Sequence, residues 1–172
     1  MEDRQSGGRS SRKAGGTPAT VALTRAGVPF DLHPYDHAAA AHPSYGLEAA
    51  AALQVDPDHV FKTLVARVDG RLVVAVVPVS GSLDLKALAA AAGGKRAGMA
   101  EPADAERATG YVLGGISPVG HRSRLDVVVD ESVTTLERVY VSAGRRGLQL
   151  SMAPADLLAV TGALVAPVGR PG

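Results

Sequence analysis

The chain has 172 residues, 46% of them hydrophobic, a formal net charge of +1 and no cysteine. That length allows one buried core, and the missing cysteines exclude disulfides, Cys-ligated zinc and a protein thiol nucleophile. The longest aliphatic run, Leu72–Val77, is far shorter than the ~20 residues of a membrane span. The weak net charge argues against a dedicated nucleic-acid binder, although residues 62–125 are more basic than the rest and form either a mixed-charge surface or a phosphate-binding one. We therefore expect a cytoplasmic protein with neither a membrane nor DNA as a partner.

The first part of the chain contains a polar segment and then a well-marked helix. Residues 1–16 are rich in Arg, Ser and Gly without the apolar core of a secretory signal, which predicts a disordered tail. Thr17-Pro18 supplies a helix cap followed by proline in the first turn, so a helix is expected over 18–26, ended by Gly27. A strand over 30–35 and an Ala-rich segment over 47–53 follow.

The middle of the chain predicts a β-hairpin. Asp69-Gly70 separates two apolar segments, 60–68 and 71–79, and this dipeptide favours a tight turn between antiparallel strands. We expect Ser82 to cap a helix over 83–92 and Asp56-Pro57 to open a short turn. The remaining predicted elements are a helix over 102–108, strands over 125–129, 139–142 and 148–151, and a helix over 154–161.

These elements predict an α/β fold of the α+β type in a single domain. Strands outnumber long helices, and their order is not a regular βαβ alternation. We expect a mixed, largely antiparallel sheet, curled or forming a partial barrel, with helices around it. The domain is predicted to span residues 17–168, with a second short tail over 169–172.

The loop from Gly110 to Gly120 is the most informative segment for function. It is expected to follow a short apolar strand, and it pairs Gly114 and Gly115 with a rigid proline, Pro118, which also restricts Ser117. Both glycines can adopt positive φ and let a ligand approach backbone amides closely. Such amides can stabilise a developing oxyanion, although a plain structural turn is the alternative interpretation.

Lys62 is the second candidate functional residue. Strand alternation places it on the same face as Leu64, Ala66 and Val68, so its ammonium is aligned with apolar side chains. It either snorkels to water from the strand end or lies partly desolvated in a pocket, where it can hold a phosphate or a reacting ester. The Ser80–Gly81 turn after the neighbouring strand is expected to add a hydroxyl and further free backbone amides.

Other catalytic patterns are missing from the sequence. Three of the five histidines, His33, His37 and His42, lie close together, but Pro34 opposes a helix that would aim two rings at one ion. No Gly-x-Ser-x-Gly, Walker or dinucleotide-binding motif is present. We therefore predict no metal, no cofactor and no nucleophile supplied by the protein.

Several separated motifs together resemble the YbaK/EbsC family of aminoacyl-tRNA editing enzymes, specifically its Cys-tRNA(Pro) deacylase branch. The resemblance covers Thr17 to about Val168. The motifs are Thr17–Ala19, His33–His37, Val60–Leu64, Val77–Gly81, Leu83–Lys86, Thr109–Gly120 and Tyr140–Leu148.

The resemblance implies hydrolytic removal of a wrong amino acid from tRNA(Pro), with Lys62 essential. It also implies that the thiol of the cysteinyl substrate attacks its own ester, while Lys62 orients the terminal adenosine and the Gly115 and Ile116 amides face the carbonyl oxygen. The expected substrate-binding residues are Tyr35, Tyr45, Ser80, Gly81, Gly114, Ser117, Pro118 and Gln149. Gln149 replaces an acid that is common in relatives, and Tyr45 replaces a phenylalanine.

Two other functions stay open from the sequence. The same fold could act on Ala-tRNA(Pro) or another small aminoacyl-tRNA, or the chain could be a non-catalytic module that binds tRNA or a synthetase. The aminoacylated 3′ end of tRNA is the expected partner in the enzymatic interpretation. The small net charge favours help from a prolyl-tRNA synthetase complex in reading tRNA identity.

Overall fold

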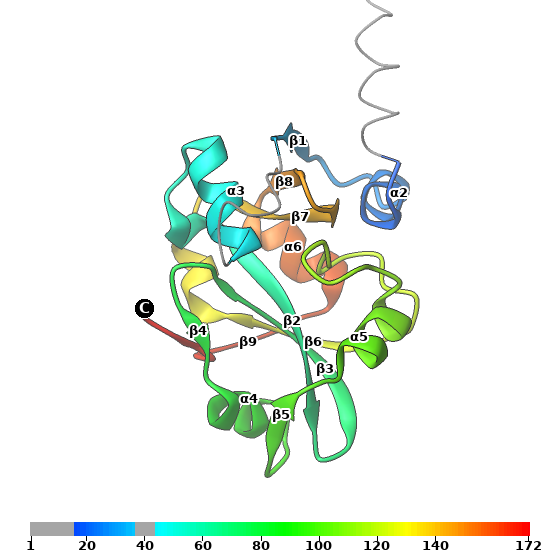
Figure 1. The fold of residues 1–172 in the computed structure, drawn as a ribbon, viewed down its shortest axis with the longest axis vertical. Helices are drawn as coiled ribbons and strands as arrows, with labels where there is room; N and C mark the ends of the chain where they lie inside the picture. The colour runs from blue at the N-terminus through cyan, green and yellow to red at the C-terminus, as the bar shows by residue number, and fades with distance from the viewer. Residues whose placement is uncertain (1–15, 37–43) are drawn as a thin grey trace, which may run out of the picture.

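A computed structural model describes residues 16–36 and 44–172, and Figure 1 shows its arrangement. Residues 1–15 of the predicted 1–16 tail, as well as His37 and His42, lie outside the described residues. Within them, five α-helices surround three sheets, which confirms the mixed α+β class. The helices are α2 (Pro18–Arg25), α3 (Tyr45–Leu53), α4 (Leu85–Ala91), α5 (Pro102–Thr109) and α6 (Pro154–Thr161).

The central sheet has five strands in the order β5-β2-β3-β6-β9 and is not closed into a barrel. β2 pairs antiparallel with β3 and β5, whereas β3–β6 and β6–β9 are parallel. The strands are β2 (Phe61–Val68), β3 (Arg71–Pro78), β5 (Ala97–Met99), β6 (Asp126–Asp130) and β9 (Leu164–Ala166).

Two smaller antiparallel sheets complete the fold. One has the order β1-β8-β7, with β1 (Asp31–Pro34), β7 (Val139–Arg145) and β8 (Leu148–Met152). The other pairs β4 (Ser82–Leu83) with β10 (Gly169–Arg170). A bridge between Val60 and Tyr140 connects the start of β2 to β7. The sheets are therefore mixed and largely antiparallel, as predicted.

Local signals explain the elements that were predicted correctly. Thr17 accepts a hydrogen bond from the Thr20 amide, and the two residues form a reciprocal capping box at the start of α2. In the β2–β3 hairpin, Asp69 and Gly70 have φ of 47° and 90°, as a type I′ turn requires. Short 3₁₀ turns, η1 (Pro57–His59) and η2 (Glu131–Thr135), start at Asp56 and Asp130.

The structure corrects two boundaries. Ser82 does not cap a helix, because Ser82–Leu83 forms β4 and the side chain of Asp84 caps α4 instead. Residues 169–172 were expected to be a tail, but Gly169–Arg170 forms β10 on β4. Residues separated by more than 80 positions meet in that pairing, so no local pattern announces it.

β2 lies between two hydrophobic clusters, one on each face. Phe61 and Val65 pack in the larger cluster with α2, α6 and the β1-β8-β7 sheet, whereas Ala66 and Val68 pack on the opposite face with α4. Burial on both faces explains why β2 has apolar residues at odd and at even positions. Lys62, near the start of the strand, is one of its three polar residues, with Thr63 and Arg67.

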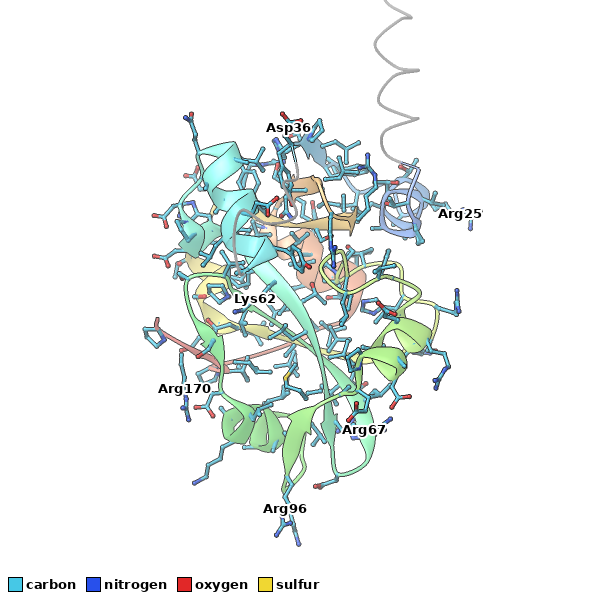
Figure 2. All side chains as sticks on the ribbon, viewed as in Figure 1. Arg25, Asp36, Lys62, Arg67, Arg96 and Arg170 are labelled. Carbon is cyan, nitrogen blue, oxygen red and sulfur yellow. The ribbon has the colours of Figure 1, made fainter. Side chains whose placement is uncertain are left out.

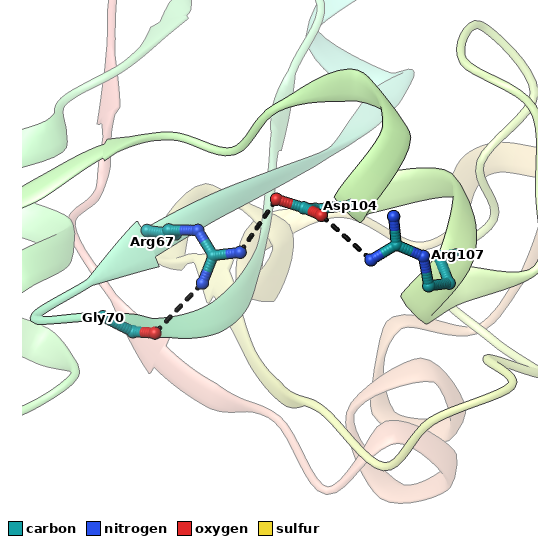
Figure 3. Close-up of polar contacts among 4 residues, drawn as sticks. All are labelled: Arg67, Gly70, Asp104 and Arg107. Carbon is teal, nitrogen blue, oxygen red and sulfur yellow. Dashed lines mark hydrogen bonds and ion pairs between the residues drawn. The ribbon is translucent and has the colours of Figure 1, made fainter.

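An ion-pair network fixes α5 against β2. Arg67 donates hydrogen bonds to the Gly70 carbonyl oxygen at 3.0 Å and to the Asp104 carboxylate at 2.9 Å, and Arg107 contacts the other oxygen of Asp104 at 3.1 Å (Figure 3). Arg67 lowers the pKa of Asp104 through these contacts. The network holds the helix that leads directly into the glycine loop.

Candidate functional site

One cavity of about 380 Å³ collects five of the eleven predicted functional residues. Its walls come from the first half of β2, the start of α3, the β5–α5 connection, the glycine loop, and single residues of β7 and β8. The volume falls in the range of small-molecule sites. Of the predicted residues, Lys62, Ile116, Tyr45, Gly114 and Gln149 line it.

Lys62 supplies the positive charge of the cavity. Figure 2 shows it at the start of β2 inside the molecule, whereas Arg25, Arg96 and Arg170 extend from the periphery. Its Nζ donates a hydrogen bond to the Gly81 carbonyl oxygen at 2.9 Å, which leaves two further N–H donors on the ammonium. Burial lowers the pKa of Lys62. Lys62 is therefore a partly desolvated cation in a cavity, which favours the pocket interpretation over snorkelling.

The glycine loop forms the wall on another side of the cavity. It follows α5, which ends at Gly110 in a left-handed conformation, and not an apolar strand as predicted. Gly114 has φ of +87°, but Gly115 does not adopt positive φ. The Gly115 N–H donates to the Val112 carbonyl oxygen at 2.9 Å. This corrects the expectation that both amides face a substrate, because the Gly115 amide is already used in a turn.

The Ile116 amide is the remaining candidate donor in the loop. Within the described part of the chain, its N–H has no hydrogen-bond acceptor, and Ile116 lines the cavity. Ser117 and Pro118 are buried behind it, and the Ser117 hydroxyl accepts the Val119 N–H. Neither residue reaches the cavity lining, so their contribution is to support the loop.

Tyr111 supports the same loop from inside the core, a role that the sequence analysis missed. It is 4% exposed, and its hydroxyl donates to the Val119 carbonyl oxygen at 2.7 Å. An aromatic side chain one residue after Gly110 was the available signal.

Arg146 is a further residue that the sequence analysis did not select. Its guanidinium lies 4.1 Å from the centre of the Tyr45 ring and donates to the Leu113 carbonyl oxygen at 2.9 Å. A Cβ on Gly114 would lie 2.6 Å from Arg146 Nε and 2.7 Å from the Tyr45 ring. Glycine is thus required where the loop, α3 and the β7–β8 hairpin meet.

Two buried polar atoms among the lining residues have no partner within the described residues. They are Thr63 Oγ1 and Gln149 Oε1. Buried polar atoms are normally paired, so these two are candidates to bind a polar group of a ligand. Tyr35 does not line the cavity, but its hydroxyl contacts the Gln149 side chain, and burial raises its pKa. Tyr35 therefore lies behind the cavity wall.

Ser80 and Gly81 line a second cavity, of about 480 Å³, and not the cavity that Lys62 lines. Ser80 donates its hydroxyl hydrogen to Asp58 and does not line the Lys62 cavity. Gly81 does not line the first cavity, but its carbonyl oxygen accepts the hydrogen bond from Lys62. The turn was predicted as a source of hydroxyl and amide groups, and it instead supplies an acceptor.

No catalytic triad forms among the residues that the structure describes. His121 Nε2 lies 2.7 Å from the Ser117 carbonyl oxygen, and His33 Nε2 lies 2.8 Å from the Ser151 hydroxyl, both away from the cavity lining. Residues 16–36 and 44–172 contain no group of three His, Cys, Asp or Glu side chains placed to hold a metal ion. The described lining therefore offers charge and hydrogen bonds without a histidine base.

Comparison with known proteins places this geometry in context. The chain is 40% identical over 114 residues to EbsC of Enterococcus faecalis, named for an inferred Cys-tRNA(Pro)/Cys-tRNA(Cys) deacylase activity, with 65% of this chain and 69% of EbsC covered. It is 31% identical over 104 residues to the multifunctional Ser/Thr-tRNA deacylase ProXp-y of Escherichia coli K12, with 58% of this chain and 62% of ProXp-y covered.

A solved structure agrees with these relatives. A candidate trans-editing enzyme for prolyl-tRNA synthetase superposes with a TM-score of 0.78 at 27% identity, covering 89% of this chain and 95% of the other. No helix in the described part of the chain is long and apolar enough to cross a membrane. Residues 43–160 match the family described as the aminoacyl-tRNA editing domain. The chain therefore belongs to the aminoacyl-tRNA editing domain family.

Proposed function

We propose that this protein is a trans-editing deacylase that removes cysteine from mischarged Cys-tRNA(Pro). The observation that carries the proposal is that Lys62, a half-buried cation, and Ile116, whose N–H has no acceptor among residues 16–36 and 44–172, both line one small cavity. A cation and a free amide suit an ester whose carbonyl oxygen gains negative charge. The EbsC relative, with its inferred Cys-tRNA deacylase activity, supports cysteine as the amino acid.

The proposed reaction uses the nucleophile of the substrate. The cysteinyl sulfur attacks the ester carbonyl carbon, a C–S bond forms, and the C–O bond to the terminal ribose breaks. The thiol proton ends on the released ribose hydroxyl, and water later opens the cyclic thiolactone to free cysteine. The absence of cysteine from the sequence, together with a described lining that offers no histidine, agrees with a substrate-supplied nucleophile.

In this proposal each wall of the cavity has a separate role. Lys62 donates to the ester or the adenosine end, and the Ile116 N–H faces the developing oxyanion. Thr63 Oγ1 and Gln149 Oε1 bind polar groups of the aminoacyl moiety, since both are buried without a hydrogen-bond partner among the residues that the structure describes. Tyr45, stacked with Arg146, borders the cavity and offers an aromatic face to the terminal adenosine.

Substrate-assisted attack also gives a reason for selectivity. A pocket that separates amino acids by one methylene discriminates by only ~1–3 kcal/mol. A reaction that requires a thiol excludes alanine and proline by chemistry. We propose that tRNA identity is read with a prolyl-tRNA synthetase partner in the cytoplasm, since a net charge of +1 supplies little attraction for a tRNA backbone.

A deacylation panel tests the proposal. Purified protein is mixed with Cys-, Ser-, Thr- and Ala-tRNA(Pro) and with S-methyl-Cys-tRNA(Pro), and release of each amino acid is timed. We expect rapid loss of cysteine while the S-methyl and alanyl esters stay intact. Equal rates for cysteine and S-methylcysteine would contradict the thiol step. Faster release of alanine, serine or threonine than of cysteine would identify a deacylase for another small aminoacyl-tRNA. Tight tRNA binding without release of any amino acid would identify a binding module.

A further inference from the structure

A chain of contacts lies behind Lys62 and extends to the end of β6. The Gly81 carbonyl oxygen that accepts the Lys62 hydrogen bond belongs to a short turn between β3 and β4. The Gly81 N–H closes this turn on the Pro78 carbonyl oxygen at 3.2 Å. The direction of that carbonyl therefore depends on what holds the turn in place.

The 168–172 segment packs directly on this turn. Gly169 pairs with Leu83 and Arg170 with Ser82 in the β10–β4 ladder. A Cβ on Gly81 would collide with the Arg170 carbonyl oxygen, so the two backbones are in contact. The Asp84 N–H donates to the Val168 carbonyl oxygen at 2.8 Å. The segment thus packs against the turn that carries the Gly81 carbonyl oxygen.

Asp130 fixes the 168–172 segment to the central sheet. It is 7% exposed at the end of β6, and its Oδ1 accepts the Val168 N–H at 3.0 Å and the Gly169 N–H at 2.7 Å. Its Oδ2 accepts the Ser132 N–H and hydroxyl, at 3.2 and 2.6 Å. A buried carboxylate with four donors is a rigid anchor, because each charge-assisted bond restricts its position.

We propose that Asp130 and the 168–172 segment are positioning elements for the reaction, which hold the Gly81 carbonyl oxygen where it directs the Lys62 ammonium into the cavity. This inference rests on the proposed function of Lys62. Asp130 does not line the Lys62 cavity, so it acts through Gly169, the β4 turn and Gly81. A small displacement of a group that stabilises charge costs rate, because the charge must meet the reacting atoms in place.

The test compares three variants with a matched control. Asp130→Ala removes every acceptor, Asp130→Asn keeps one oxygen for the Val168 and Gly169 amides, and a chain ending at Val168 removes β10. Asp126→Ala is the control, because Asp126 lies at the other end of β6 and its exposed side chain pairs with Arg71. Deacylation kinetics, thermal unfolding and the ¹³Cε signal of Lys62, one of only four lysines, are measured.

We expect Asp130→Ala and the shortened chain to lose about tenfold in kcat with KM within about twofold of the parent. Asp130→Asn should keep most of the parental kcat, because one side-chain oxygen still accepts the Val168 and Gly169 amides. The Lys62 ¹³Cε signal should shift in the two impaired variants and stay in place in Asp126→Ala. A general loss of stability would not by itself move this signal in the folded protein.

Folded Asp130→Ala protein with parental kcat and an unchanged Lys62 signal would overturn the inference. If Asp130→Ala does not fold, the kcat and the Lys62 signal of the chain that ends at Val168 test the inference, because this chain keeps Asp130 and all of β6. If the parent deacylates none of the esters, the proposed function fails, whereas the Lys62 signal still reports whether Asp130 controls its environment. The two failures are therefore distinguishable.

Discussion

The glycine loop over 110–120 and the Ser80–Gly81 turn contribute opposite polar groups around the same site. The loop contributes Ile116, whose N–H has no acceptor among the described residues, to the cavity lining, whereas the turn presents the Gly81 carbonyl oxygen to Lys62. Glycine is needed in both places for close packing. Gly114 meets Arg146 and Tyr45, and Gly81 meets the backbone of Arg170.

The comparison shows that a glycine turn does not by itself predict which backbone group it offers. Both turns were expected to supply amides, but the Gly115 amide closes a turn on Val112, and the 80–81 turn supplies an acceptor. In our proposal the donor stabilises an oxyanion and the acceptor holds a cation, so the two segments stabilise opposite charges. The following predictions separate the two contributions.

The largest effect is expected from Lys62→Met, which removes the cation and keeps a side chain of similar length. Deacylation should fall by about 10²- to 10³-fold, as for loss of a group that stabilises transition-state charge. The thermal midpoint should stay level or rise, because burial of an ammonium is unfavourable. Single-turnover deacylation and calorimetry measure the two effects.

Lys86→Met is the matched control for that substitution, since Lys86 is exposed on α4. It should leave both the rate and the midpoint unchanged. A folded Lys62→Met protein that deacylates as fast as the parent would show that the cation takes no part in the reaction, and the loop alone would have to account for catalysis.

A smaller effect is expected from Gly114→Ala, which tests the loop. The substitution places a Cβ in a left-handed conformation, φ +87°, and within 2.7 Å of Tyr45 and Arg146 atoms. The loop must shift, so kcat/KM should fall by about ten- to hundredfold. Gly162→Ala is the control, because Gly162 has φ +63° with open space around it. Equal activity of the two variants would mean that the loop position is not critical.

The smallest effect is expected from pH. The Lys62 ammonium must stay protonated, and burial lowers its pKa, so the proton leaves at a pH below the ~10.4 of ordinary lysine. The rate should rise as the substrate thiol ionises and then decline several-fold at alkaline pH, while the loop amide does not titrate. Rates measured from about pH 6 to about pH 10, beside the Lys62 ¹³Cε titration, check this. A rate that still rises at the top of this range would contradict it.

The elements that the sequence predicted well depend on local signals. The capping box at Thr17, the Asp69-Gly70 turn and the helix over 154–161 agree with the structure within one residue. Caps and tight turns are decided by neighbours in the chain, so their residues identify them directly. Lys62 was also identifiable, because a cation stood in a run of apolar strand residues.

The misassigned features depend on segments that are distant in sequence. Ser82 could cap a helix by its type, but β10 arrives from residue 169 and pairs it into β4. Ser80 was assigned to the Lys62 site, but it faces Asp58 in a second cavity. Arg146 was missed because its partners, Tyr45 and Leu113, lie on two other segments.

By itself, the sequence determined the hairpin, the helices that begin at Pro18, Pro102 and Pro154, the candidate cation and the family motifs, because those follow from short-range backbone preferences and residue types. Only the tertiary structure decided which backbone groups remain free. The Gly115 amide is used by Val112 inside the loop, and the Ile116 amide has no acceptor within residues 16–36 and 44–172. Asp130 accepts the Gly169 amide and so holds the strand that packs on the Gly81 turn. Such pairing is a property of the folded chain, since each buried polar group must find its partner in three dimensions.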